Sequence, residues 1–170
     1  LLDEAYVEFG NNSMASAIPS NPNLIVLRTF SKWAGLAGMR GGHGGFPSEL
    51  MPQLWKTKQP YNVNVAATAA ALASLQEQER QLEIVARMVR ERSRMERLLA
   101  EITFLRMYPS WANFVLCRVD GRGARDLQQA LQGEGILVRH FSKPSLCDHI
   151  RISVGKTEHT DALLAILTRL

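Results

Sequence analysis

The sequence predicts an α/β fold in which two regions of mixed strands and helices are joined by one long helix. Residues 23–28 (NLIVLR) form a near-continuous apolar run, as expected for a strand covered on both faces of a parallel sheet. Residues 79–101 carry apolar side chains at helical spacing among Arg and Glu. Strand-like and helix-like segments then alternate again. We therefore expect a first region at 1–78, a connecting helix at 79–102 and a small domain at 103–170.

The first region begins with strands and ends with helices. Residues 10–23 are rich in Gly, Asn, Ser and Pro and indicate a loop between two strands. Pro47 precedes an acidic first turn, which favours a short helix. The expected elements are strands at 1–7, 23–28 and 40–46, a short helix from Pro47, and an alanine-rich helix at 62–77.

The small domain shows shorter periodic segments. Apolar runs rich in β-branched residues indicate strands, and Gly133 and Gly135 mark the end of a helix. The expected elements are strands at 113–118, 136–141 and 149–154, and helices at 123–134 and 157–169.

Composition narrows the class of partner. The net charge is +4, and the 20 Lys and Arg residues are spread along the chain. No basic run alternates with aromatic residues, so we expect no nucleic-acid partner, whereas small anions suit the charge.

Cys117 and Cys147 fit no metal-binding spacing and predict two reduced thiols. No apolar run is long enough to cross a bilayer, so we expect no membrane partner.

One stretch, residues 28–40 (RTFSKWAGLAGMR), predicts chemistry. A lysine forms an imine with an aldehyde when its amine is unprotonated, and a nearby cation favours that state. Lys32 is such a lysine, Arg40 is a nearby cation that also suits a phosphate, and Ser31 adds a hydroxyl donor. The small residues between Lys32 and Arg40 allow a bound group to approach the backbone. This pattern suits pyridoxal phosphate, an aldehyde that carries a phosphate.

Three further residues complete this interpretation. The ring nitrogen of that cofactor stays protonated beside a carboxylate, and Asp3 in the segment DEAY is the candidate. Tyr6 is a candidate hydrogen-bond donor to the ring oxygen, and Arg151 suits a substrate carboxylate. Each residue also has an ordinary alternative: a surface lysine, a turn aspartate, or an arginine in an ion pair. Spacing alone leaves both interpretations open.

The chain resembles a known family over essentially all of its length. The segments DEAY, NLIVLRTFSKWAGLAGMRGG and IRISVGKTEHTDALL are similar to the C-terminal half of histidinol-phosphate aminotransferases, which are fold-type I pyridoxal-phosphate enzymes of the class I/II aminotransferase superfamily. The stretch FPSELMPQLWKTKQPYNVNVAA looks most like the versions in plants, algae and related bacteria. At His43 the family often has an aromatic residue instead.

The resemblance implies a role for each candidate. Lys32 would bind the cofactor aldehyde and later move a proton between the substrate and the cofactor, while Asp3 would pair with the pyridine nitrogen. Tyr6 would contact the ring oxygen. Ser31 and Arg40 would hold the cofactor phosphate. Arg151 would bind the carboxylate of glutamate or 2-oxoglutarate and the phosphate of histidinol phosphate, with Arg139 near that phosphate.

The resemblance also sets the wider expectations. Residues 1–78 would form the C-terminal part of the large, mostly parallel-sheet domain, and residues 103–170 would form the small domain. We expect a homodimer when complete, and cytoplasmic or, in a plant or alga, plastid-stromal localisation. Because the chain starts at Leu1 inside a strand, we expect a fragment that lacks part of the cofactor site and is inactive alone. The alternatives are an aromatic aminotransferase, a threonine-phosphate decarboxylase, a non-catalytic degenerate homologue and, last, a basic nucleic-acid binder.

Overall fold

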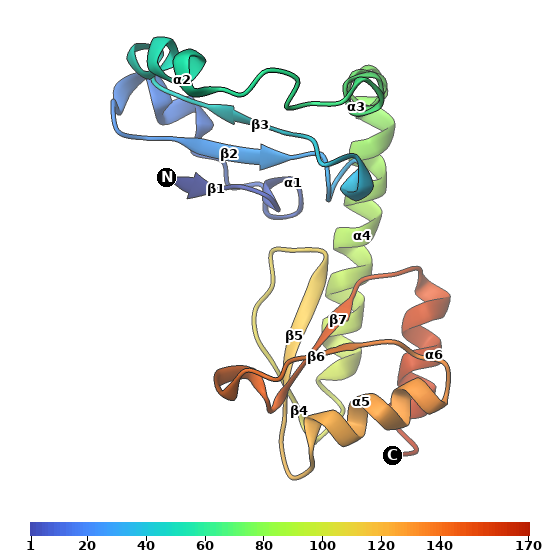
Figure 1. Cartoon of the computed structure of the whole chain (residues 1–170). Helices are drawn as coiled ribbons and strands as arrows, with labels where there is room; N and C mark the ends of the chain where they lie inside the picture. The colour runs from blue at the N-terminus through green and yellow to red at the C-terminus, as the bar shows by residue number, and fades with distance from the viewer. The chain divides into compact units, whose positions relative to one another are not determined.

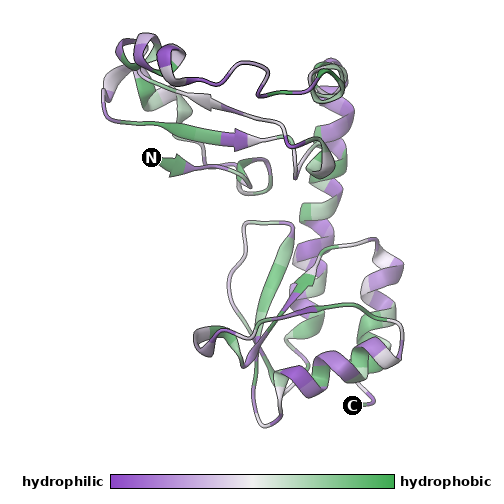
Figure 2. Cartoon of the chain, viewed as in Figure 1, coloured by the Kyte–Doolittle hydropathy of each residue, from purple (hydrophilic) through white to green (hydrophobic).

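The computed structural model describes residues 1–170, which form two compact units at Leu1–Val85 and Ala86–Leu170. The boundary falls inside the long helix α4 (Gln78–Leu99). Bands of polar and apolar residues alternate along this helix (Figure 2), as its spacing predicts. No helix combines the length and the apolar character that a membrane crossing needs.

The first unit contains a three-stranded sheet in the order β1–β2–β3 (Figure 1). Strand β1 (Leu2–Asp3) pairs in parallel with β2 (Val26–Thr29), and β2 pairs antiparallel with β3 (Gly42–Gly45). The glycines of β3 have a packing reason. A Cβ on Gly42 would lie 2.7 Å from the Arg28 carbonyl oxygen, so a larger residue there would press on the backbone of β2.

Short helices connect and follow these strands. Helix α3 begins where the side chain of Asn64 accepts a hydrogen bond from the Ala67 amide (2.7 Å), which is ordinary N-capping. The helical elements are α1 (Val7–Gly10), α2 (Met51–Thr57), α3 (Val65–Gln76) and the 3₁₀ helices Ala15–Ser20, Ala37–Met39 and Ser48–Leu50.

The first strand is shorter than the sequence predicts. We expected a strand at 1–7, but β1 ends at Asp3. The Asp3 carboxylate accepts a hydrogen bond from the Ala5 amide (2.9 Å), and this local turn competes with continued strand pairing. The backbone then enters α1.

The second unit contains a four-stranded antiparallel sheet in the order β4–β5–β7–β6. Strand β4 (Leu105–Met107) was not expected from the sequence. Strand β6 is shorter than the expected 136–141, because the Ile136 amide bonds to the Leu131 carbonyl (2.8 Å) at the end of a helix. The elements are β5 (Phe114–Val119), β6 (Arg139–His140), β7 (His149–Ser153), α5 (Ala124–Gly133), α6 (Thr157–Leu167) and the 3₁₀ helix Pro144–Leu146.

The core of this unit lies between one face of the sheet and its helices. Val115 and Cys117 of β5 and Ile150 of β7 are fully buried, and they pack with apolar residues from α4, α5 and α6. Because side chains alternate along a strand, Arg118 and Arg151 lie on the opposite face of the sheet. The α/β fold class predicted from the sequence is confirmed.

A polar cluster joins α4 to α6. The buried Glu91 carboxylate accepts hydrogen bonds from Arg94 (2.9 Å) and from Thr157 (3.0 Å), and Arg94 also bonds to Asp161. Burial by itself raises the pKa of Glu91, but these hydrogen bonds outweigh it and hold that pKa below its ordinary value. Glu91 is therefore a buried, ionised carboxylate that links α4 to α6.

Candidate functional site

Asp3 and the segment that carries Lys32 leave the sheet at the same edge. Strands β1 and β2 are adjacent and parallel, with Asp3 aligned to Leu27. The carboxyl ends of parallel strands are where α/β proteins place ligands. Asp3 ends β1, and Lys32 follows three residues after Thr29, the last residue of β2. The topology therefore brings these two candidates to one end of the sheet.

The amine of Lys32 lies against an aromatic ring. Its Nζ is 5.4 Å from the centroid of the Tyr6 ring, a distance at which the π-face attracts a cation. Tyr6 stands directly before α1 and follows the turn in which the Asp3 carboxylate accepts from the Ala5 amide (2.9 Å). Lys32 is exposed and forms no ion pair with a carboxylate. This leaves the amine accessible for reaction.

Local hydrogen bonds from side chains and a glycine in the left-handed region shape the turn that contains Lys32. The Ser31 amide donates to Oγ1 of Thr29 (3.0 Å), which fixes the start of the turn. Gly35 has φ +68°, in the left-handed region that favours glycine, and a Cβ on it would meet no atom within 4 Å. Arg40 also has a positive φ (+56°), and its guanidinium donates to the Ala37 carbonyl (2.8 Å). The Arg40 side chain thus bonds back to the backbone of the same turn, three residues earlier.

Two buried aromatic side chains flank Ser31 and Lys32 in the sequence and pack against each other. Phe30 and Trp33 are buried on either side of Ser31 and Lys32, with ring centroids 5.9 Å apart. Phe30 also contacts His43 (5.3 Å), so His43 fills a packing position where the family often has an aromatic residue. Because Phe30 and Trp33 are buried, the backbone between them has little freedom to move. A fixed backbone at Lys32 suits a reactive side chain.

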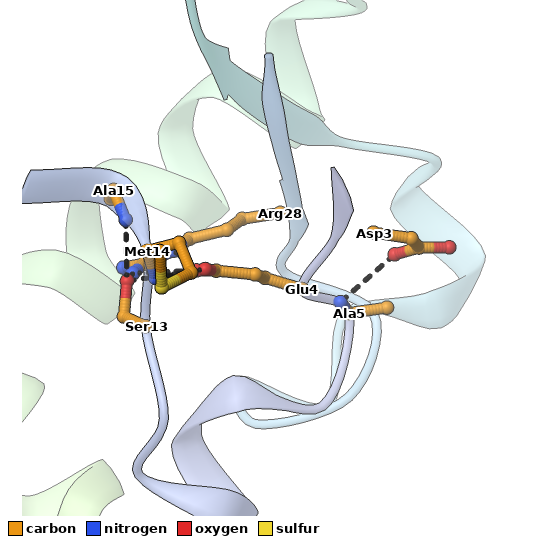
Figure 3. Close-up of polar contacts among 7 residues, drawn as sticks. All are labelled: Asp3, Glu4, Ala5, Ser13, Met14, Ala15 and Arg28. Carbon is orange, nitrogen blue, oxygen red and sulfur yellow. Dashed lines mark hydrogen bonds and ion pairs between the residues drawn. The ribbon is translucent and has the colours of Figure 1, made fainter. Parts of the chain in front are cut away.

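Sequence reasoning missed a buried charged cluster on the other face of the same strands. Glu4 is only 6% exposed, and its Oε2 accepts from Nε (3.0 Å) and Nη2 (2.9 Å) of Arg28 and from Ser13 (3.0 Å). Its Oε1 accepts from the Met14 amide (2.6 Å). Figure 3 shows Glu4 reaching toward this cluster and Asp3 pointing away from it. The signal in the sequence was the acidic pair of DEAY, of which only Asp3 was considered.

The Glu4 carboxylate is ionised in this environment. Burial alone raises its pKa, but the Met14 amide, Arg28 and Ser13 together hold the pKa below its ordinary value. A buried ion pair with several hydrogen bonds is costly to break by removing one partner. This cluster therefore fixes the strand end beside Asp3.

The remaining candidates, Arg139 and Arg151, lie in the second unit. They are directly opposite each other across β6 and β7, so both side chains stand on the same face of the sheet. The guanidinium of Arg151 lies 5.0 Å from the centroid of the Phe114 ring, and its buried Nε has no hydrogen-bond partner. An unpaired buried donor in a pair of like charges suits an anion.

The first-unit residues fit a phosphate-bearing aromatic aldehyde. They offer an accessible lysine amine, a carboxylate at the neighbouring strand end, an aromatic ring and a turn with open space at Gly35 and Gly38. No group of three His, Cys, Asp or Glu side chains is arranged to hold a metal ion. The sequence-predicted residues thus fall into two sets, one in each unit.

Comparison with known proteins places this arrangement in context. The family model "Aminotransferase class I and II" matches residues 1–167. A histidinol-phosphate aminotransferase of Roseiflexus castenholzii is 50% identical over 169 residues, which cover 98% of this chain and 46% of that protein. A chloroplastic histidinol-phosphate aminotransferase of Nicotiana tabacum is 48% identical over 169 residues, covering 98% of this chain and 41% of that protein.

Solved structures agree with these relatives. Histidinol-phosphate aminotransferase of Sinorhizobium meliloti, in complex with pyridoxal-5'-phosphate, superposes with a TM-score of 0.83 at 30% identity and covers 99% of this chain. The alignment covers 48% of that structure. The chain therefore spans about half the length of the relatives that it matches.

Proposed function

Since the chain belongs to the class I and II aminotransferase family, we propose that it is the C-terminal part of a pyridoxal-phosphate-dependent histidinol-phosphate aminotransferase. The complete protein would exchange an amino group between histidinol phosphate and 2-oxoglutarate in histidine biosynthesis. The identity of 48–50% to relatives of that name supports the substrate. The placement of Lys32 over Tyr6, beside the strand end that carries Asp3, supports the chemistry.

Each residue of the first unit would have a defined task. Pyridoxal phosphate, when bound, supplies an aldehyde that accepts the amino group and a ring that withdraws electrons. Lys32 would hold the aldehyde and, once displaced by the substrate amine, move the proton at the substrate Cα. The Asp3 carboxylate would keep the ring nitrogen protonated, and the Tyr6 hydroxyl would bond to the ring oxygen. Ser31 and Arg40 would contact the phosphate.

The task of Arg40 requires a change of partner. In this structure its Nη1 donates to the Ala37 carbonyl. A phosphate is the stronger acceptor because a charge-assisted bidentate bond is about twice as strong as a neutral one. Arg40 would therefore turn to the phosphate when the cofactor binds.

The second unit would bind the substrate. The guanidinium of Arg151 has a buried Nε without a partner, and a carboxylate or a phosphate would satisfy it. Arg139, directly opposite, would add a second cation for the doubly charged phosphate. Arg151 would thus alternate between the carboxylate of glutamate and the phosphate of histidinol phosphate.

We also propose the residue boundaries 1–78, 79–102 and 103–170 for the large domain, the connecting helix and the small domain.

The complete protein would be a homodimer located in the cytoplasm, or in the plastid stroma of a plant or alga. The second location has the support of the relative named chloroplastic. This chain alone would bind the cofactor weakly and show little turnover, because it spans less than half of the relatives.

The test uses the complete protein. Turnover of histidinol phosphate with 2-oxoglutarate is compared with turnover of phenylalanine and with decarboxylation of threonine phosphate. We expect histidinol phosphate to be the preferred substrate. Preference for either competitor would replace the proposed substrate with that alternative.

A second measurement separates an enzyme from a degenerate homologue. Borohydride reduction in the presence of pyridoxal phosphate should attach the cofactor to Lys32, as read by peptide mass spectrometry, and Lys32→Ala should lose this label. No label at Lys32 in the complete protein would favour a non-catalytic protein.

A further inference from the structure

Glu4 and Arg28 are neighbours in the parallel pairing of β1 and β2. Asp3 aligns with Leu27, and the Glu4 amide bonds to the Leu27 carbonyl (2.8 Å), so Glu4 comes next to Arg28. Their side chains meet on one face through two hydrogen bonds of 2.9 and 3.0 Å. Alternation along a strand then places Asp3 and Thr29, the residues before Glu4 and after Arg28, on the opposite face.

Both members of this pair are directly linked to the residues of the proposed chemistry. Glu4 lies between Asp3 and Ala5, whose carboxylate and amide close the first turn (2.9 Å). Arg28 precedes Thr29, whose Oγ1 receives the Ser31 amide at the start of the Lys32 turn (3.0 Å). A movement of either strand end would therefore change the spacing between the two turns.

Ser13 and Met14 restrict the same pair from the loop side. The Ser13 hydroxyl donates to Glu4 and accepts from Nη2 of Arg28 (2.6 Å), and the Met14 amide donates to Glu4 (2.6 Å). Figure 3 shows the four residues converging on one side of β1 while Asp3 extends to the other. Every donor around the Glu4 carboxylate thus opposes its rotation toward Asp3.

We propose that Glu4 and Arg28 are positioning residues: their buried pair fixes the spacing and the facing of the two strand ends that carry Asp3 and Lys32. This role rests on the proposed function, since the spacing matters because one cofactor ring must meet both residues. A fork with two parallel hydrogen bonds sets both distance and orientation, which a single point charge does not. The pair therefore acts on the chemistry only through Asp3 and Lys32.

The experiment measures the two turns directly in the complete protein. Hydrogen–deuterium exchange at the Ala5 and Ser31 amides is compared between wild type and Glu4→Gln. Removal of the charged partner should speed both amides about tenfold or more, because local opening loses a charge-assisted bond. Arg28→Met should give the same pattern. Arg28→Lys, which keeps the charge without the fork, should fall between Arg28→Met and wild type.

Glu91→Gln is the matched control. Glu91 is also a buried carboxylate that accepts from an arginine and a hydroxyl, but it lies in the second unit. It should speed amides of that unit and leave Ala5 and Ser31 unchanged. If Glu4→Gln speeds Ala5 and Ser31 no more than Glu91→Gln does, Glu4 contributes only general stability and the positioning role is wrong.

A double variant tests whether the pair acts as one unit. Glu4→Gln combined with Arg28→Met should speed exchange at Ala5 and Ser31 no more than the larger single effect, because each single change already breaks the pair. Additive effects would mean that the two residues act independently, which contradicts the proposal.

A separate measurement tests the dependence on the proposed function. In the complete protein, pyridoxal phosphate is reduced onto the chain, and labelling of Lys32 is compared with labelling of Lys156, which is exposed in the second unit. Glu4→Gln should lower the ratio of Lys32 to Lys156. If wild type shows no preference for Lys32, the proposed function fails, whereas the amide exchange still decides whether the pair positions the two turns.

Discussion

Arg139 and Arg151 stand directly opposite each other on adjacent antiparallel strands, with both side chains on the same face of the sheet. Two like charges at such positions repel and destabilise the strand pair. In addition, the buried Nε of Arg151 has no hydrogen-bond partner. Two like charges beside an unpaired buried donor suit a ligand of opposite charge, which would satisfy the donor and relieve the repulsion.

Neutralising one arginine should therefore stabilise the chain when no anion is present. Arg139→Gln should raise the free energy of unfolding at low salt by roughly 0.2–0.5 kcal/mol, because the repulsion across the strands is relieved. High salt should erase the difference. Inorganic phosphate should raise the melting temperature of wild type more than that of Arg139→Gln. Equal shifts in the two proteins would show that Arg139 binds no anion.

Acid should unfold the chain through its two buried carboxylates. The pKa of Glu4 and that of Glu91 lie below the ordinary value in the folded state, although burial opposes this, because charged and hydrogen-bonding partners surround them. The unfolded state therefore binds more protons, so this stability is present above about pH 4.5 and is lost as pH falls through the folded values. Denaturant unfolding from pH 7 to pH 3 should show a flatter acid limb in Glu4→Gln and Glu91→Gln than in wild type.

Glu8 should behave in the opposite sense. Burial raises its pKa, partly offset by a local backbone hydrogen bond and by Arg28, and its Oε2 is buried without a hydrogen-bond partner. A raised folded pKa means that the ionised form costs stability at neutral pH; protonation relieves this cost as pH falls through the folded pKa, and the relief is complete below about pH 4.5. Because Glu8 is partly exposed and solvent screens its charge, Glu8→Gln should stabilise the chain by at most about 0.5 kcal/mol at pH 7. The gain should shrink toward pH 4, and a gain that stays constant with pH would contradict this explanation.

The two thiols should differ in reactivity. Cys117 is fully buried in the second unit, and burial raises its pKa to about 12, whereas Cys147 is exposed. The thiolate is the reactive form, so Cys117 should be inert at pH 8. A chromogenic disulfide reagent should titrate one thiol in the native chain and two after unfolding, and Cys147→Ser should remove the native reaction. Rapid labelling of Cys117 in the native state would show that the core opens readily.

The sequence predicted most of the regular structure because its signals are local. The periodicity of residues 79–101 locates α4 to within two residues at each end, and the apolar run at 23–28 locates β2. The predictions were wrong where a competing local bond decides the structure. The Asp3 carboxylate ends β1 early by taking the Ala5 amide, and the Leu131 carbonyl takes the Ile136 amide before β6 can start.

The candidate site shows the same division. Lys32 and its small-residue turn were visible as a motif, and the aminotransferase family that the chain as a whole resembles is confirmed. Glu4 was invisible as a functional residue, because its partners Ser13, Met14 and Arg28 are 9, 10 and 24 positions away along the chain. Only pairing of the strands brings them together. Contacts of this kind depend on register, and register is not written in any short stretch of sequence.

Met39 shows a further limit of pattern reasoning. An apolar side chain by itself favours a core position, but the Met39 side chain is 37% exposed. The turn it belongs to lies beyond the end of β2, where the Asn64 side chain at the start of α3 donates to the Met39 carbonyl (3.4 Å) but the Met39 side chain stays partly exposed. Hydrophobicity alone therefore did not locate the boundary of the core.

Asp3, the last residue of β1, and Glu4, which follows it, are adjacent acids whose side chains point to opposite sides of the chain (Figure 3). Inserting one residue before Asp3, with the upstream pairing unchanged, would move Asp3 into the position that Glu4 now occupies beside Arg28. The shorter Asp3 side chain would then face Arg28, Ser13 and Met14, and Glu4 would point to the opposite side of the strand. Such a protein would keep both acids in its sequence and lose the placement of each, so one added codon here would do more harm than one changed codon.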